Sequence, residues 1–113
     1  MPIVIIIVFA AAAVFGLLNL LAILGNKHTN KPVVFVHGIL AAAALVLLII
    51  FTINSTGNSP VISLILFIIV ALVGFFLFAR DLSKKPGPKA VAIIHGLVAV
   101  ISFILLLIFA FSY

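Results

Sequence analysis

The sequence predicts an all-helical membrane protein, a bundle of four transmembrane helices built from two tandem hairpins that insert in the same orientation. Composition is the first observation behind this prediction. Of the 113 residues, 68% are hydrophobic and 6% are charged, and the mean hydropathy is +1.68. Soluble domains have about a quarter of their residues charged. A water-soluble fold is therefore excluded.

The second observation is the division of the chain into four apolar stretches, at about residues 3–25, 32–53, 60–80 and 88–112. Each has about the twenty residues that a helix needs to cross a bilayer. Four segments are too few to close a barrel, so helices are expected. The first stretch follows no basic segment and is too long for a signal-peptide core, so we expect it to be retained. The chain is predicted to form one transmembrane domain, residues 1–113.

The polar segments between these stretches predict the topology. All six lysine and arginine residues lie in the first and third segments, 25–32 and 80–89, whereas the second, 54–60, has no charge. By the positive-inside rule the two basic loops are cytoplasmic and both termini lie outside. We expect an integral protein of a bacterial inner membrane, with the lipid bilayer rather than nucleic acid as the partner of its basic residues. Gly25 suits a helix C-cap and Pro32 a helix start.

The third observation is an internal repeat of about residues 1–55 and 59–113, which appears when the sequence is shifted by 58 residues. Matches at Lys, His and Gly positions are not expected from composition alone. Because each half has two helices, both halves insert in the same orientation, with a pseudo-two-fold axis along the membrane normal. The matched pairs are Ala13 and Ala71, Gly16 and Gly74, Leu24 and Leu82, Lys27 and Lys85, Lys31 and Lys89, Val33 and Val91, His37 and His95, Gly38 and Gly96, Ala41 and Ala99, Leu48 and Leu106, and Phe51 and Phe109.

The repeated histidines are the main functional signal. His37 and His95 each lie six residues after a repeated lysine, Lys31 and Lys89. At 1.5 Å per residue this places both about 9 Å into the cytoplasmic half of the bilayer. An ionisable side chain is costly there and indicates a bundle interior or a site. Small residues share the helix face of each histidine, namely Ala41 and Ala44 with His37, and Ala99 and Ser102 with His95. A glycine follows each histidine directly, Gly38 and Gly96. The partner helices carry Gly16 and Gly74.

Two neutral imidazoles at one depth, related by a two-fold axis, suit the axial ligation of one haem iron. Haem propionates would point to the cytoplasmic edge, and an apolar aromatic shell would surround the ring. Bis-histidine ligation leaves no open position for oxygen or substrate, so we expect an electron carrier rather than an enzyme. The cations available to propionates are Lys27, Lys31, Arg80, Lys85 and Lys89, and the aromatic candidates are Phe35, Phe75, Phe76 and Phe78.

A family resemblance supports haem b. Residues 37–41 (His-Gly-Ile-Leu-Ala) and 95–99 (His-Gly-Leu-Val-Ala) resemble the His-Gly-x-Leu-Met/Ala signature of the ascorbate-reducible transmembrane cytochromes b. The resemblance implies haem b held on a four-helix core, with ascorbate or a quinol-type donor. That family uses four histidines for two haems, one near each membrane face. This chain has two intramembrane histidines, so one haem per protomer follows. The chain also resembles small four-helix membrane proteins of bacteria.

A structural role for the histidines is the alternative. Asn19 lies at about the depth of His37, and a hydrogen bond between such residues on two helices would contribute about 1 kcal/mol. On this interpretation the chain is a non-catalytic accessory or structural subunit of a larger membrane complex, or forms a homo-oligomer. The very short loops favour it.

Other functions have little support in the sequence. Two histidines without a carboxylate or thiol make an incomplete zinc or copper site. His28 is expected to be a solvated loop residue. No serine stands in a nucleophile motif and no intramembrane carboxylate could act as a base. The first helix has no acidic residue, which argues against a small multidrug transporter, and no polar stripe continues through the membrane as in a channel.

Overall fold

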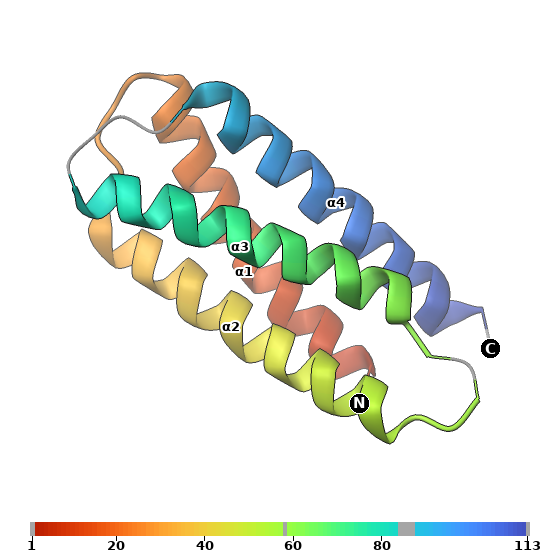
Figure 1. Cartoon of the computed structure of the whole chain (residues 1–113). Coiled ribbons are helices and arrows are strands. Elements are labelled where there is room, and N and C mark those ends of the chain that lie inside the picture. The colour runs from red at the N-terminus through yellow and green to blue at the C-terminus, as the bar shows by residue number, and fades with distance from the viewer. Residues whose placement is uncertain (1, 58, 84–87, 113) are drawn as a thin grey trace.

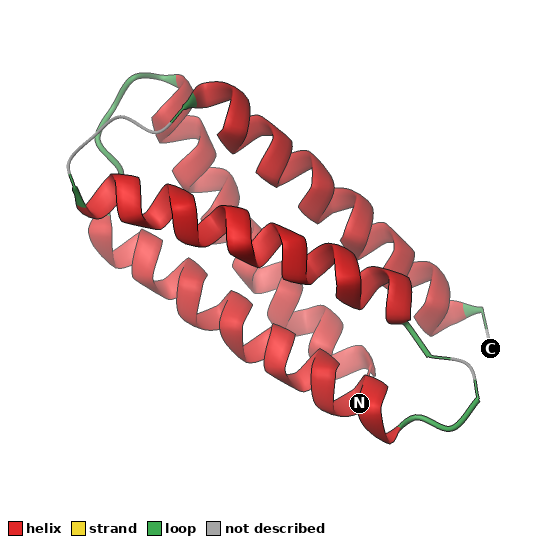
Figure 2. Ribbon diagram, in the orientation of Figure 1, coloured by secondary structure: helices red, strands yellow, loops and turns green. Residues whose placement is uncertain are grey.

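The described part of the chain, residues 2–57, 59–83 and 88–112 of a computed structural model, is helical with short connections (Figures 1 and 2). The helices agree with the four predicted apolar stretches to within two residues at each end, which confirms the predicted fold class at this level. Each helix is long and apolar enough to cross a membrane. They are α1 (Pro2–Leu24), α2 (Lys31–Asn54), α3 (Val61–Leu82) and α4 (Lys89–Phe111).

The ends of the first connection follow known capping chemistry. At the end of α1, the amide of Lys27 donates to the carbonyl of Ala22 (2.9 Å) and the amide of Asn26 to that of Ile23 (3.1 Å). This is the Schellman pattern. Gly25 follows the last residue of α1 and is the C-cap, as expected, and the left-handed residue that closes the motif is the next one, Asn26, with φ of 57°. Pro32 is in the first turn of α2 as predicted, where a missing amide proton costs nothing.

The four helices form an elongated bundle with extents of 45 × 23 × 19 Å. Helix α1 packs against α2 and α4, and α3 packs against the same two helices, so α1 lies diagonally opposite α3 and α2 diagonally opposite α4. Figure 1 shows the end of α1, the start of α2, the end of α3 and the start of α4 at one end of the bundle, and the opposite ends of the same helices at the other. We call these the basic end and the uncharged end.

The tightly packed core lies in the uncharged half of the bundle. The buried cluster comes from the first halves of α1 and α3 and the second halves of α2 and α4: Ile5, Phe9, Ala44, Leu48, Phe67 and Leu106. Two aromatic pairs join diagonal helices there. The rings of Phe9 and Phe67 stack with centroids 4.1 Å apart, and those of Phe51 and Phe109 meet edge to face at 6.1 Å. The members of each pair are 58 residues apart in the sequence.

The outer surface of the bundle is apolar around its circumference. Large aliphatic and aromatic side chains are well exposed on every helix, for example Ile7 on α1, Ile39 on α2, Leu72 on α3 and Leu97 on α4. Exposed apolar area on this scale is unusual in a soluble monomer. It suits contact with hydrocarbon or with another apolar surface.

Candidate functional site

The imidazole of His37 packs into a notch on α1. Its Nδ1 lies 2.7 Å from the carbonyl oxygen of Ala12. A carbonyl only accepts, so Nδ1 carries a proton in this contact, and in the neutral imidazole Nε2 then keeps the lone pair. The Cε1 edge of the ring also packs closely against Gly16, because a Cβ added there would be 2.8 Å from His37 Cε1. A helical side chain covers the turn that precedes it. Gly16 therefore leaves the carbonyl of Ala12, four residues earlier, open to the imidazole.

The imidazole of His95, on α4, packs against the corresponding position of α3. A Cβ added to Gly74 would be 3.2 Å from His95 Cε1. The ring is directed toward the backbone of Val70, four residues before Gly74. It does not reach the hydrogen-bond geometry of His37, and its buried Nδ1 has no hydrogen-bond partner within residues 2–57, 59–83 and 88–112. The two hairpins thus hold their histidines in the same way, except for this one bond.

Both histidines lie on the interior faces of their helices. His37 shares its face with Ala44 and Leu48, which are completely buried, and His95 shares its face with Ser102 and Leu106. This confirms the faces expected from helical spacing. Helices α2 and α4 lie diagonally opposite each other across the bundle. The two imidazoles therefore face the interior from opposite corners, in the half near the basic end.

The glycines beside the histidines differ from each other. A Cβ added to Gly38 would meet no atom within 4 Å among the residues described, whereas one added to Gly96 would lie 3.7 Å from Leu20 Cδ2. Gly38 is exposed on α2 and Gly96 faces α1. The seam between α1 and α4 is therefore filled by Leu20 at this level, while the surface beside Gly38 is open.

The expected aromatic shell is assembled only in part. Phe75 and Phe76 are 69% and 48% exposed, so these two candidates lie on the outer surface of α3 and away from the histidines. Phe76 instead faces the guanidinium of Arg80, 5.9 Å from the ring centroid. Phe78 is partly buried and meets Phe35 edge to face at 5.6 Å, but Phe35 is itself 48% exposed. Helical rotation explains the difference, because three of four consecutive positions cannot share one face.

The expected cations lie at the basic end. Lys31 and Lys89 are the first residues of α2 and α4, and Lys27 lies in the α1–α2 connection. Lys85, the repeat counterpart of Lys27, lies outside the described residues. Lys27, Lys31 and Lys89 are exposed, as topology signals usually are, so none of these three is on the interior face that carries the imidazoles.

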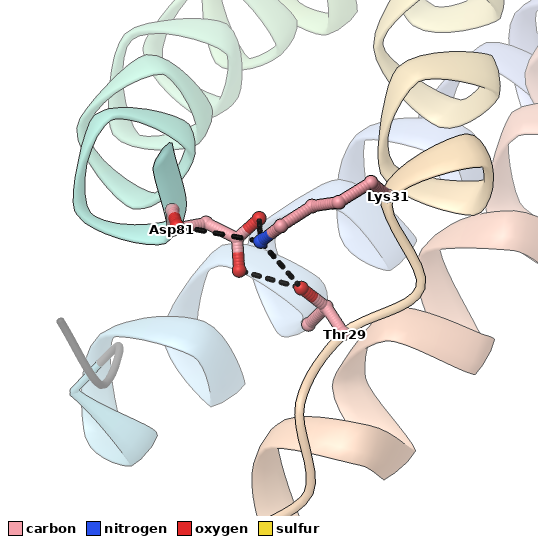
Figure 3. Close-up of polar contacts among 3 residues, drawn as sticks. All are labelled: Thr29, Lys31 and Asp81. Atoms are coloured by element: carbon pink, nitrogen blue, oxygen red, sulfur yellow. Dashed lines mark hydrogen bonds and ion pairs between the residues drawn. The ribbon is translucent and has the colours of Figure 1, made fainter. Parts of the chain in front are cut away.

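A polar cluster at the basic end was not predicted from the sequence (Figure 3). The Nζ of Lys31 pairs with Asp81 Oδ2 at 2.6 Å and donates to the Asp81 carbonyl at 3.3 Å. The hydroxyl of Thr29 donates to Asp81 Oδ1 at 2.5 Å. The cluster ties the start of α2 to the end of α3. Its sequence signal was Asp81 itself, the single acidic residue of the chain, placed within a run of basic residues.

The arrangement has limited but definite chemical capacity. Within the described ranges, no group of three or more His, Cys, Asp or Glu side chains could hold a metal ion. Two imidazoles without a carboxylate or thiol make an incomplete zinc or copper site. The role of the site has to follow from its own residues, because no protein-family model matches the chain, and searches of characterised proteins and of solved structures find no similar protein.

Proposed function

We propose that this chain is an integral membrane cytochrome b that holds one haem between His37 and His95 and transfers electrons. The proposal starts from the bilayer. Four apolar helices and an apolar circumference favour insertion. The helix ends that flank the two basic segments lie at the same end of the bundle in Figure 1, which fits a cytoplasmic face at that end. A bacterial inner membrane remains our expectation.

The second element of the proposal is a tandem repeat of two hairpins about a pseudo-two-fold axis. Several contacts support it. Phe9 meets Phe67 and Phe51 meets Phe109 across diagonal helices, and each pair joins residues that a shift of 58 makes equivalent. His37 on Gly16 is likewise repeated as His95 on Gly74. On such an axis, His37 and His95 are equivalent ligands on opposite sides of one central group.

The main observation in support of haem binding is the hydrogen bond from His37 Nδ1 to the carbonyl oxygen of Ala12. Metal-ligating histidines almost always donate their second ring N–H to a carbonyl or carboxylate, which fixes the ring and raises the basicity of the ligating nitrogen. His37 Nε2 is thereby left as the free donor atom. In the proposed site His37 would ligate through Nε2, and His95, which packs on Gly74 as His37 packs on Gly16, would supply the second ring nitrogen.

The surrounding side chains fit the same proposal. Phenylalanine pairs fill the bundle axis in the uncharged half, whereas interior positions near the histidines carry small residues such as Ala12, Gly16 and Gly74. A haem held there would supply one-electron chemistry, and bis-histidine ligation would leave no position for substrate. Lys31 is already neutralised by Asp81, so Lys89 is the better candidate for a propionate. The donor would be a quinol or a redox partner protein.

The test is the absorption spectrum of the purified protein, prepared with haem available during expression. A Soret band is expected in the wild type and its loss in His37→Ala and His95→Ala. His28→Ala is the matched control, because His28 lies in the α1–α2 connection outside the helices, and it should keep the band. A folded wild-type bundle that takes up no pigment would refute the haem, and so would a His95→Ala variant that keeps a bis-histidine spectrum.

A second function is favoured by the same contacts, namely that of a structural subunit of a larger membrane complex or a homo-oligomer. Each imidazole packs inside its own hairpin, which gives it a role in helix association without any ligand. This function predicts a colourless protein that co-purifies with larger partners or with itself. His37→Ala would then lower the stability of the bundle and change no spectrum.

A further inference from the structure

Ser63, the third residue of α3, carries a buried hydroxyl that its own helix does not satisfy. The residue is 2% exposed, and its Oγ has no hydrogen-bond partner within residues 2–57, 59–83 and 88–112. The other buried serine, Ser102, donates to the carbonyl of Val98, four residues earlier, at 2.7 Å. For Ser63 that carbonyl belongs to Ser59, which precedes α3 and accepts from the amide of Val61 instead. Because buried polar groups are hydrogen-bonded with few exceptions, the Ser63 hydroxyl points to a partner that α3 does not supply.

Ser63 lines a pocket between the start of α3 and the end of α4, at the uncharged end of the bundle. The pocket has a volume of about 240 Å³. Ser59 adds a second hydroxyl to its lining, and Phe109 is one of the apolar residues that form the rest. Ile62 and Ile108 also line the pocket and are well exposed, so it opens on the outer surface of the bundle.

The two halves of the chain differ at this position. A shift of 58 residues makes Ser63 equivalent to Ile5, and Pro60, which also lines the pocket, equivalent to Pro2. Ile5 is completely buried and belongs to the core cluster, so an isoleucine fills the corresponding place at the start of α1. Serine has a shorter side chain and adds a polar atom. The second hairpin therefore has space and a hydroxyl where the first hairpin has packed hydrocarbon.

We propose that this pocket binds the head ring of a lipid-soluble quinone or quinol, with Ser63 Oγ hydrogen-bonded to a ring oxygen. Ligand pockets typically combine an apolar lining with a few polar groups that fix orientation. A quinone carbonyl accepts a hydrogen bond and a quinol hydroxyl can also donate one, and a serine hydroxyl serves both. The pocket volume exceeds the roughly 150 Å³ in which an apolar protein cavity holds a benzene ring.

The charge distribution favours this neutral head over a phospholipid headgroup. Residues 54–60 contain no charged side chain, and all lysine and arginine residues lie in the two segments of the basic end. Phosphate recognition relies mainly on arginine and lysine. The apolar tail of a quinone would leave the pocket on its open side, where Ile62 and Ile108 are exposed.

The test is photolabelling of the purified protein in phospholipid bilayers with an azido-substituted benzoquinone, followed by mass spectrometry of the labelled residues. Saturable labelling is expected at the start of α3 and the end of α4, with competition by the unsubstituted benzoquinone. Ser63→Ile, which copies Ile5, should abolish this labelling. Ser63→Ala should weaken the apparent affinity about two- to tenfold, as expected for the loss of one neutral hydrogen bond. Labelling that does not saturate, or that is unchanged in Ser63→Ile, would overturn the proposal.

A control variant and a second readout keep the test decisive. Thr52 lies at the same end of the bundle, and its hydroxyl already donates to the carbonyl of Leu48 at 2.8 Å. Thr52→Val should therefore label as the wild type does. If Ser63→Ile does not form the bundle, Ser63→Ala keeps the pocket open and carries the test, and an apparent affinity equal to that of the wild type would overturn the proposal.

Only the role of the bound quinol rests on the proposed function, in which this pocket would receive the electron donor. The labelling itself needs no haem. A colourless protein that is labelled in the pocket would refute the haem alone. A protein with a Soret band and no saturable labelling at the start of α3 would refute the quinone pocket alone.

Discussion

Gly16→Ala should weaken the bundle because the new methyl group would overlap the His37 imidazole. The added Cβ would lie 2.8 Å from Cε1 and 3.1 Å from Nδ1 of that ring, well inside the roughly 3.5–4 Å at which non-bonded carbon atoms rest. The ring has little freedom to withdraw, since its Nδ1 is bonded to the Ala12 carbonyl at 2.7 Å. Relief requires the imidazole to leave the notch and give up that bond.

The size of the effect follows from three contributions. Overpacking a well-packed site costs about 1–3 kcal/mol, and losing an interhelical hydrogen bond in a membrane protein costs about 0.6–2 kcal/mol. Alanine gains about 1 kcal/mol over glycine in helix propensity. The net expectation for Gly16→Ala is a loss of about 1–3 kcal/mol in the free energy of unfolding.

Two other glycines provide matched comparisons. A Cβ on Gly74 would be 3.2 Å from His95 Cε1, and His95 makes no equivalent carbonyl bond to lose, so Gly74→Ala should stay within about 1 kcal/mol of the wild type. A Cβ on Gly38 would meet nothing within 4 Å in the described chain, so Gly38→Ala should be neutral or slightly stabilising. The three variants therefore rank in the order Gly38→Ala, Gly74→Ala, Gly16→Ala from most to least stable.

The assay is reversible unfolding of the purified protein in mixed micelles, with sodium dodecyl sulfate as denaturant and helical content followed by circular dichroism. Equal stability of Gly16→Ala and Gly38→Ala would show that the His37 ring does not fill the notch on α1. Such a result would remove the main contact on which the arrangement of the site depends, whatever the pigment content of the protein.

Three further predictions use the same unfolding assay. Asp81→Asn should lower the free energy of unfolding by about 0.2–1 kcal/mol at low salt and by less at high salt. The reason is that the Lys31 and Asp81 side chains of this ion pair are 47% and 22% exposed, so salt screens their attraction. A loss of stability that grows with salt would contradict this explanation. Leu48→Ala, at a completely buried position, should cost about 2–5 kcal/mol, whereas Ile53→Ala at 74% exposure should change stability by less than about 0.5 kcal/mol. Equal effects would place the core elsewhere. Alanine replacements of Phe9 and Phe67 should be non-additive by about 0.5–1.5 kcal/mol in a double-mutant cycle, since their rings stack at 4.1 Å; strict additivity would argue against that contact.

Much of the architecture was predictable because it depends on composition and spacing. A run of about twenty apolar residues has few options other than a transmembrane helix, and short polar connections force neighbouring helices to be antiparallel. The interior faces of α2 and α4 also followed from helical periodicity, and the burial of Leu48 and Leu106 agrees with it. These features involve one helix at a time or the lengths of the connections between them.

Contacts that join two helices were harder to predict from the sequence. The notch that receives His37 combines Gly16 with the Ala12 carbonyl, and its existence depends on the relative height of α1 and α2. The sequence identifies Gly16 as a small residue on the partner helix, but it does not show which side chain packs against it. The salt bridge between Asp81 and Lys31 joins α3 to α2 through residues that are 50 positions apart in the sequence. Predicting such pairs requires the rotation and register of both helices, which hydropathy does not encode.

The location of the imidazole contacts has a consequence for how the chain assembles during synthesis. His37 meets Ala12 and Gly16 within the first hairpin, so these contacts are available as soon as α2 has left the ribosome. The aromatic pairs Phe9–Phe67 and Phe51–Phe109 require helices from both hairpins. Each hairpin can thus close on its own as it is made, and the late phenylalanine contacts then select which faces the two finished hairpins turn toward each other.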